Sequence, residues 1–221
     1  THKNKAAFEK SIAHLSKGKC LLVFPEGVSV TEKKILPLKT GVARIARETV
    51  LAEGKELGLK IIPVGLNYTD PHAFRSDLFV NIGEPIEVAD FISKAASNEK
   101  EEVRKLTDHI EQCMIDSVLH IETEEVEEIL DGINRTYARD LKHKLGVAFT
   151  DQNREFELNK LTISAVKHFQ NDDPAAYEKM KVLLDDYISK LDAQGIKDKD
   201  LRKVDEKTTL AQTIYLVFGF P

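Results

Sequence analysis

The character of the chain changes near residue 92, and this change constrains the fold more than any other feature. Five of the seven prolines and seven of the eleven glycines lie before it, among short apolar runs that alternate with helical periods. Such alternation is typical of α/β proteins with a parallel or mixed sheet. After it, apolar residues recur at helical spacing with few prolines. We therefore expect an α/β domain over 1–92 and a helical region over 93–221.

Two helices and three strands are expected in the first region. The helices cover 4–17 and a segment starting at Thr40, and the strands cover 20–24, 60–66 and 78–82. The run Cys20–Phe24 is continuously apolar, which is typical of a strand buried on both faces. Pro63 gives the second strand an irregular or edge position.

Five helical segments are expected in the second region: 98–118, 123–146, 153–170, 174–194 and 206–218. The acidic run at 122–128 is expected to form a solvated helix face. Asn171–Pro174 predicts that one helix stops and the next begins, with Pro174 in its first turn. Some apolar positions fit either an internal core or a partner-binding face: Phe156, Leu161, Ile163, Val166 and Phe169.

Composition excludes several classes of protein. Two cysteines are too few for a disulfide framework or a zinc cluster, and a net charge of -5 argues against nucleic-acid binding by bulk positive charge. No run of twenty apolar residues supplies a complete membrane span. The chain begins at Thr1 and ends in the apolar run Ile214–Pro221. We therefore expect an excised fragment whose end is a truncated hydrophobic segment, or else a short buried terminal element.

One turn carries residues suited to ligand chemistry. The apolar run leads into Phe24-Pro25-Glu26-Gly27-Val28-Ser29, and Lys39 stands just before the second helix. Gly27 allows a ligand to approach the backbone, and a helix N-terminus beside a lysine suits a phosphate. Glu26 is ambiguous: it would bind a substrate hydroxyl or hold a neighbouring backbone. An ordinary turn with a surface lysine explains the same spacing.

Three blocks in order give the chain a family resemblance. Phe24-Pro-Glu-Gly27, then Leu36-Pro-Leu-Lys-Thr-Gly41, then Ile62-Pro63-Val64 closely resemble the glycerol-phosphate acyltransferases, which include lysophosphatidic acid acyltransferases. The resemblance implies a partial mixed sheet with flanking helices, with 1–92 as the C-terminal part of the acyltransferase domain. It places the Pro-Val block near the acyl donor. It also implies an acceptor site made of Phe24, Pro25, Glu26, Gly27, Ser29, Lys39 and Gly41.

The sequence departs from that family in two places. Val28-Ser29-Val30 stands where the family commonly has Thr-Arg-Ser, so the usual phosphate-binding arginine is missing and Lys39 is expected to supply the charge. The family's catalytic His-x-x-x-x-Asp precedes the Pro-Glu-Gly turn. Here His2 and His14 are followed, five residues on, by alanine and lysine.

Two matches to that pattern lie downstream, His72 with Asp77 and His168 with Asp173, and chance accounts for both. We expect His168 to cap a helix end. No residue of this chain is assigned as catalytic. The base and its aspartate are expected to precede Thr1, and the chain alone is expected to be inactive.

The resemblance implies an O-acyltransferase of phospholipid synthesis. Such an enzyme moves an acyl chain from acyl-CoA or acyl-carrier protein to a glycerol 3-phosphate-type acceptor, without metal or organic cofactor, because the thioester is already activated. It implies membrane association on the cytoplasmic side, and no nucleic-acid partner. The alternative is a non-catalytic helical scaffold or partner-binding protein whose α/β half is silent.

Overall fold

The computed structural model describes residues 2–28, 30, 32–69, 74–93, 98–137, 141 and 152–198. The chain divides into two compact units, Thr1–His120 and Ile121–Pro221. The first contains α1 (His2–Leu15), α2 (Gly41–Glu53), η1 (Lys55–Leu57), β1 (Lys60–Ile61), β2 (Val64–Tyr68), β3 (Leu78–Ile82), β4 (Ile86–Glu87), η2 (Val88–Phe91) and α3 (Glu99–Ser117). The second contains α4 (Glu124–Thr136), α6 (Gln152–Asp172) and α7 (Pro174–Gln194).

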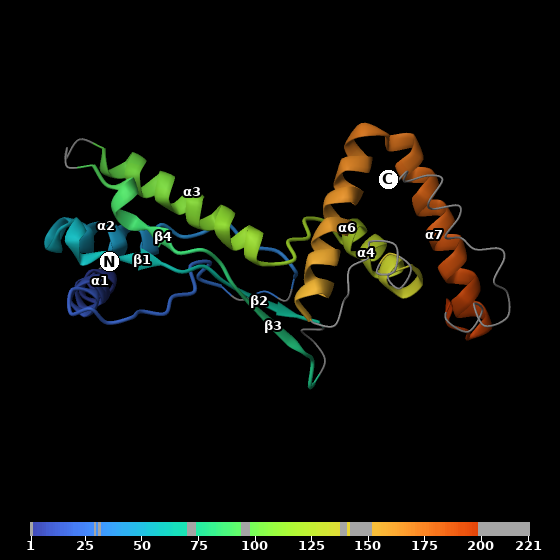
Figure 1. Ribbon diagram of the computed structural model, residues 1–221, viewed down its shortest axis with the longest axis horizontal. Helices are drawn as coiled ribbons and strands as arrows, with labels where there is room; N and C mark the ends of the chain where they lie inside the picture. Colours follow the sequence, from blue (N-terminus) through green and yellow to red (C-terminus); the bar gives the residue numbers. More distant parts are fainter. Residues whose placement is uncertain are drawn as a thin grey trace. The chain divides into compact units, whose positions relative to one another are not determined.

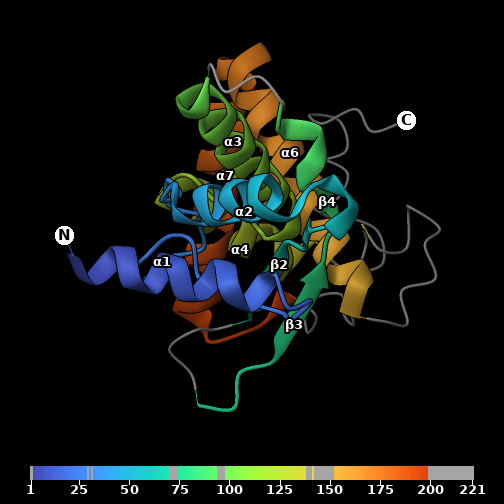
Figure 2. The same cartoon turned by 90° about the vertical axis from the view of Figure 1, so that its left-hand side faces the viewer.

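Helix α2 is the centre of the first unit and lies between α1 and α3 (Figure 1, Figure 2). Its small buried residues Ala43 and Ala46 allow close packing, and α3 brings Leu106 and Ile110 into the same core. This packing assigns α3 to the first unit. The compact unit therefore ends at His120, beyond the change in composition near residue 92.

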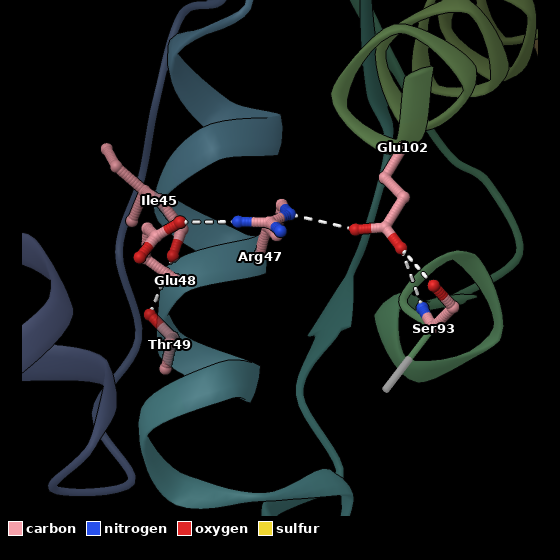
Figure 3. Close-up of polar contacts among 6 residues, drawn as sticks. All are labelled: Ile45, Arg47, Glu48, Thr49, Ser93 and Glu102. Atoms are coloured by element: carbon pink, nitrogen blue, oxygen red, sulfur yellow. Dashed lines mark hydrogen bonds and ion pairs between the residues drawn. The ribbon is translucent and has the colours of Figure 1, made fainter. Parts of the chain in front are cut away.

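A buried ion pair joins α2 to α3 within this core (Figure 3). Arg47 Nε donates to Glu102 Oε2 over 2.9 Å, and the two side chains are only 8% and 9% exposed. The second oxygen of Glu102 accepts from the Ser93 amide at 2.9 Å and the Ser93 hydroxyl at 2.6 Å. Arg47 also donates to Glu48 over 2.7 Å. Both buried charges thus have partners, the condition under which such a pair is tolerated in a core.

The same contacts lower the pKa of Glu102 from its ordinary 4.5 to about 2. The largest cause is the hydrogen bond from the Ser93 hydroxyl; burial opposes the shift, and the hydrogen bond from Arg47 adds to it. The pKa of Arg47 is raised, chiefly by its hydrogen bond to Glu102.

The described strands form two antiparallel pairs, β1 with β4 and β2 with β3. The expectation of a mixed α/β architecture is met, whereas the parallel pairing expected within the sheet is absent from the described strands. The expected strand 60–66 is interrupted between β1 and β2 at Ile62 and Pro63, as proline predicts. The expected strand 78–82 is β3.

The hairpin of β2 and β3 packs on the C-terminal end of α3. Asn67 and Asn81 both donate side-chain amide hydrogens to the carbonyl oxygen of Ser117, at 3.2 Å and 3.4 Å. Asn67 also accepts from the Leu119 amide at 2.9 Å. These bonds satisfy helix-end groups that have no partner within the helix. Gly65 allows the contact, because a Cβ there would lie 2.0 Å from the Ser117 oxygen.

The expected buried strand over 20–24 is wrong. The segment is not a strand, and its side chains are exposed, with Leu22 at 81% and Phe24 at 70%. Among the described residues no strand pairs with it, although the Cys20 carbonyl oxygen lies 3.1 Å from His14 Nε2. A continuous apolar run forms a buried strand only where neighbouring strands pair with it and other elements cover both faces.

The second unit is a helical core of α4, α6 and α7, which contact one another pairwise. Gly132 of α4 faces α7 so closely that a Cβ would lie 2.8 Å from Leu184. Phe156, Ile163 and Val166 are buried here, which supports the core interpretation for these three positions, whereas Leu161 is 60% exposed and Phe169 is half-buried.

The predicted helix boundaries in this unit are largely confirmed. Asp173 accepts from the Ala176 amide and caps α7, with Pro174 in the first turn. The acidic run is partly paired, since Glu122 and Glu125 bind Lys167 and Lys181. The expected helix 123–146 is too long, because α4 ends at Thr136 with Tyr137 as its C-cap. Residues 138–140, 142–146 and the whole of the expected helix 206–218 lie outside the described residues.

Substituting Glu102→Gln should destabilise the first unit by about 3 kcal/mol at neutral pH, because it leaves Arg47 buried without a countercharge. The pKa of Glu102 is lower in the folded chain than in the unfolded chain. The stabilisation is therefore complete above pH 4.5 and is lost as the pH falls toward 2. Amide hydrogen exchange of core residues in α2 and α3, compared between the unmodified chain and the Glu102→Gln variant, measures this loss of stability. The stability difference between the unmodified chain and Glu102→Gln should shrink below pH 4.5. Glu99 lies outside the ion pair, so Glu99→Gln should show no such pH-dependent change.

Substituting Gly65→Ala should cost about 2 kcal/mol or more, because the new methyl group overlaps the Ser117 backbone and must push β2 away from α3. Urea unfolding measures the loss. The matched control is Gly41→Ala, whose Cβ would meet Phe8 at an ordinary 3.7 Å. Equal stability of the two variants would contradict the described packing.

Candidate functional site

The candidate site is the loop that joins the exposed segment ending at Phe24 to helix α2. It opens with a turn in which the Gly27 amide donates to the Phe24 carbonyl at 3.3 Å. Gly27 has φ +72°, a backbone conformation that favours glycine. Glu26 Oε2 accepts from the Leu36 amide at 2.9 Å, so this carboxylate holds neighbouring backbone, one of the two roles that the sequence left open.

The far end of the loop returns to the same turn. The Lys39 amide donates to the Pro25 carbonyl at 2.9 Å. The stem of Lys39 passes Gly27, where a Cβ would lie 3.5 Å from Lys39 Cγ. That distance is an ordinary contact, so the glycine is required for its backbone angle rather than for space. The Pro-Glu-Gly turn and Lys39 are therefore brought together, as the sequence suggested.

Every backbone amide hydrogen in residues 35–39 is donated to an acceptor. The Leu36 and Lys39 amides bind within the loop, and Pro37 has none. The Leu38 amide donates to Glu111 Oε2 at 2.8 Å, and the Ile35 amide donates to His120 Nδ1 at 3.1 Å. The loop is thus fixed partly by groups distant in sequence.

Glu111 and His120 were not among the predicted site residues. Glu111 reads as an ordinary polar position on a helix, and His120 follows that helix without a motif around it. The only available signal was indirect, because Leu36-Pro-Leu has no side-chain acceptors of its own for the loop's amides.

The start of α2 presents an uncapped end. Thr40 makes no side-chain capping hydrogen bond, and the first turn has no acidic residue. Such an end carries partial positive charge from the helix dipole. Gly41, the first helical residue, faces Phe8 of α1. An anion beside Lys39 would therefore meet a lysine charge and a favourable helix end together.

The remaining expected site residues are placed less tightly. Phe24 is 70% exposed, and no polar contact engages its side chain. Gly41 belongs to α2 and contacts α1 rather than the turn. Ser29 lies outside the described residues. The structure brings together the turn and Lys39, which directly precedes the N-cap residue of α2.

The downstream histidine pairs do not form catalytic pairs where they are described. His168 Nδ1 lies 3.1 Å from Asp172, both exposed on α6, while Asp173 caps α7. His168 thus pairs within its helix rather than capping the helix end. His72 lies outside the described residues. The Asp77 carbonyl oxygen accepts from the Thr69 amide at 3.0 Å, and the Asp77 amide donates to Thr69 Oγ1 at 3.1 Å, so Asp77 closes the hairpin.

The described residues contain no group of three or more histidine, cysteine, aspartate or glutamate side chains arranged to hold a metal ion. No helix among them is long and apolar enough to cross a bilayer.

Comparison with known proteins points to one family. Residues 1–67 match the family model described as Acyltransferase. The chain is 28% identical over 172 residues to glycerol-3-phosphate O-acyltransferase 1 of Saccharomyces cerevisiae, covering 76% of this chain and 22% of the relative. It is 28% identical over 212 residues to glycerol-3-phosphate O-acyltransferase 2 of the same yeast, covering 96% and 27%.

An uncharacterized acyltransferase of Schizosaccharomyces pombe is 28% identical over 192 residues, covering 86% of this chain and 27% of the relative. The chain thus spans about a quarter of the length of these relatives. No solved structure matches. The resemblance to the glycerol-phosphate acyltransferases is confirmed by these matches.

Proposed function

We propose that this chain, whose residues 1–67 match the Acyltransferase family model, is part of an enzyme that acylates a glycerol 3-phosphate-type acceptor. In the proposed reaction the acceptor hydroxyl oxygen attacks the carbonyl carbon of an acyl thioester. A base takes the hydroxyl proton, an ester bond forms, and the thiolate leaves. The donor is acyl-CoA or acyl-carrier protein, and the product is a phospholipid precursor.

The observation that carries the proposal is the closure of the loop between Pro25 and Lys39. It brings Lys39 against the Pro-Glu-Gly turn, and Lys39 directly precedes Thr40, the N-cap residue of α2, which makes no side-chain capping bond. A phosphate ester needs positive charge and amide donors, and this arrangement offers both. In our proposal Lys39 and the start of α2 hold the acceptor's phosphate.

Glu26 takes a supporting role in this proposal. A carboxylate facing a phosphate would repel it, but Glu26 uses Oε2 to hold the Leu36 amide. Its contribution is then the shape of the loop rather than contact with the phosphate. Ser29 and Gly41 remain proposed members of the site, and the enzyme is proposed to work at the cytoplasmic side of a membrane, where its lipid product belongs.

Substituting Lys39→Ala should weaken binding of glycerol 3-phosphate by roughly tenfold, the usual cost of one charge-assisted hydrogen bond. A chemical-shift titration of the 221-residue chain measures the Kd, with shifts expected in residues 25–41. Glycerol, which lacks the phosphate, should produce none.

The matched control for that titration is Lys10→Ala, which removes the same charge from the exposed surface of α1. It should leave the Kd within about twofold, because Lys10 is exposed to solvent and its charge is screened by salt. If both variants weaken binding equally, attraction to net charge explains the result, and the proposed role of Lys39 is wrong.

The 221-residue chain alone should release no thiol from acyl-CoA above the rate of spontaneous hydrolysis, because none of its residues is proposed as the base. A thiol-reactive dye follows the release with and without glycerol 3-phosphate. Acceptor-dependent turnover that His72→Ala or His168→Ala abolishes would place the base within this chain and overturn that assignment.

A further inference from the structure

We infer that Glu111 and His120 are positioning residues of the acceptor site, a role that rests on the proposed function of the loop before α2. Neither residue belongs to the motif blocks, and both lie far from the loop in sequence. Glu111 is 73 residues from Leu38, and His120 is 85 residues from Ile35. Their side chains accept hydrogen bonds from two backbone amides for which the loop itself has no acceptor.

The first step is the geometry of the two bonds. Glu111 Oε2 accepts from the Leu38 amide at 2.8 Å, and His120 Nδ1 accepts from the Ile35 amide at 3.1 Å. Both acceptors are half-buried, so water replaces them poorly. As acceptor, Nδ1 carries no proton in this arrangement. The two bonds lie on either side of Pro37, which has no amide hydrogen of its own.

The second step is that Leu38 is held twice. Its amide is bound by Glu111, and its side chain packs on the core that α2 and α3 share. Lys39 follows directly, with its amide on the Pro25 carbonyl. The position of the lysine backbone is therefore set by α3 on one side and by the Pro-Glu-Gly turn on the other.

The third step concerns the helix that provides these contacts. Helix α3 holds α2 through the bond of Glu102 to Arg47, and the loop before α2 through Glu111. One helix thus fixes both the lysine and the helix start that the phosphate is proposed to meet. Releasing either amide leaves the core intact but lets the loop adopt other positions, so binding must then order it again.

The experiment pairs a disruptive and a conservative variant at each position, in the 221-residue chain. Glu111→Ala removes the acceptor, whereas Glu111→Gln keeps a carbonyl oxygen that accepts. His120→Ala removes the acceptor, whereas the Oδ1 of His120→Asn replaces Nδ1. Amide exchange of Leu38 and Ile35 reports the two bonds, and titration with glycerol 3-phosphate reports the site.

Glu111→Ala should speed exchange of the Leu38 amide tenfold or more and raise the Kd for glycerol 3-phosphate at least threefold, and Glu111→Gln should restore both. His120→Ala should likewise speed exchange of the Ile35 amide and raise the Kd, and His120→Asn should restore both. The control is Gln112→Ala on the exposed side of α3, where the side chain bonds only along its own helix, to Asp116. It should change neither measurement.

The outcomes separate the two claims. Faster Leu38 exchange with unchanged affinity would sink the positioning role and leave the acceptor site standing. Failure of the unmodified chain to bind glycerol 3-phosphate would sink the site, and the positioning role with it. Should one alanine variant unfold, the other tests the same claim at a separate amide, and loss of affinity that neither conservative variant restores would count against the inference.

Discussion

The first unit depends on the ion pair of Arg47 with Glu102, because this pair decides how α3 sits on α2. Burying two charges is costly unless each has partners, and here Ser93 and Glu48 provide them. An apolar contact would tolerate sliding, whereas a hydrogen-bonded pair in the core fixes one register of the two helices. The register therefore also sets the position of the groups that bind to the later turns of α3.

The loop before α2 depends on this register more than any other segment does. Glu111 lies further along the same helix as Glu102, so the Leu38 amide has a fixed partner only while the register holds. At its other end α3 is held by the β2–β3 hairpin, whose asparagines bind the Ser117 carbonyl. The helix is therefore held at two points, by Arg47 near its start and by the hairpin at its C-terminal end, and the loop meets it between them at Glu111.

Sequence patterns predicted most elements of this chain, because helical periodicity and proline positions are local properties. The segment Asn171–Pro174 shows why: a capping aspartate and a first-turn proline act on adjacent residues. Residues 20–24 show the limit, since whether an apolar run becomes a buried strand depends on neighbours that it does not encode. Likewise the turn and Lys39 were predictable, but Glu111 and His120 were not, because their partners lie more than 70 residues away.

Carboxylates beside a proposed phosphate site call for a physical reason, and the geometry supplies one. Glu26 and Glu111 each accept a hydrogen bond from a backbone amide of the loop through one carboxylate oxygen. Their negative charge therefore stabilises the loop. Each such bond to an ionised acceptor is stronger than a neutral one. A loop ordered in this way before the ligand arrives loses little conformational entropy on binding. The same two carboxylates that would repel a phosphate at close range thus lower the cost of holding one at Lys39.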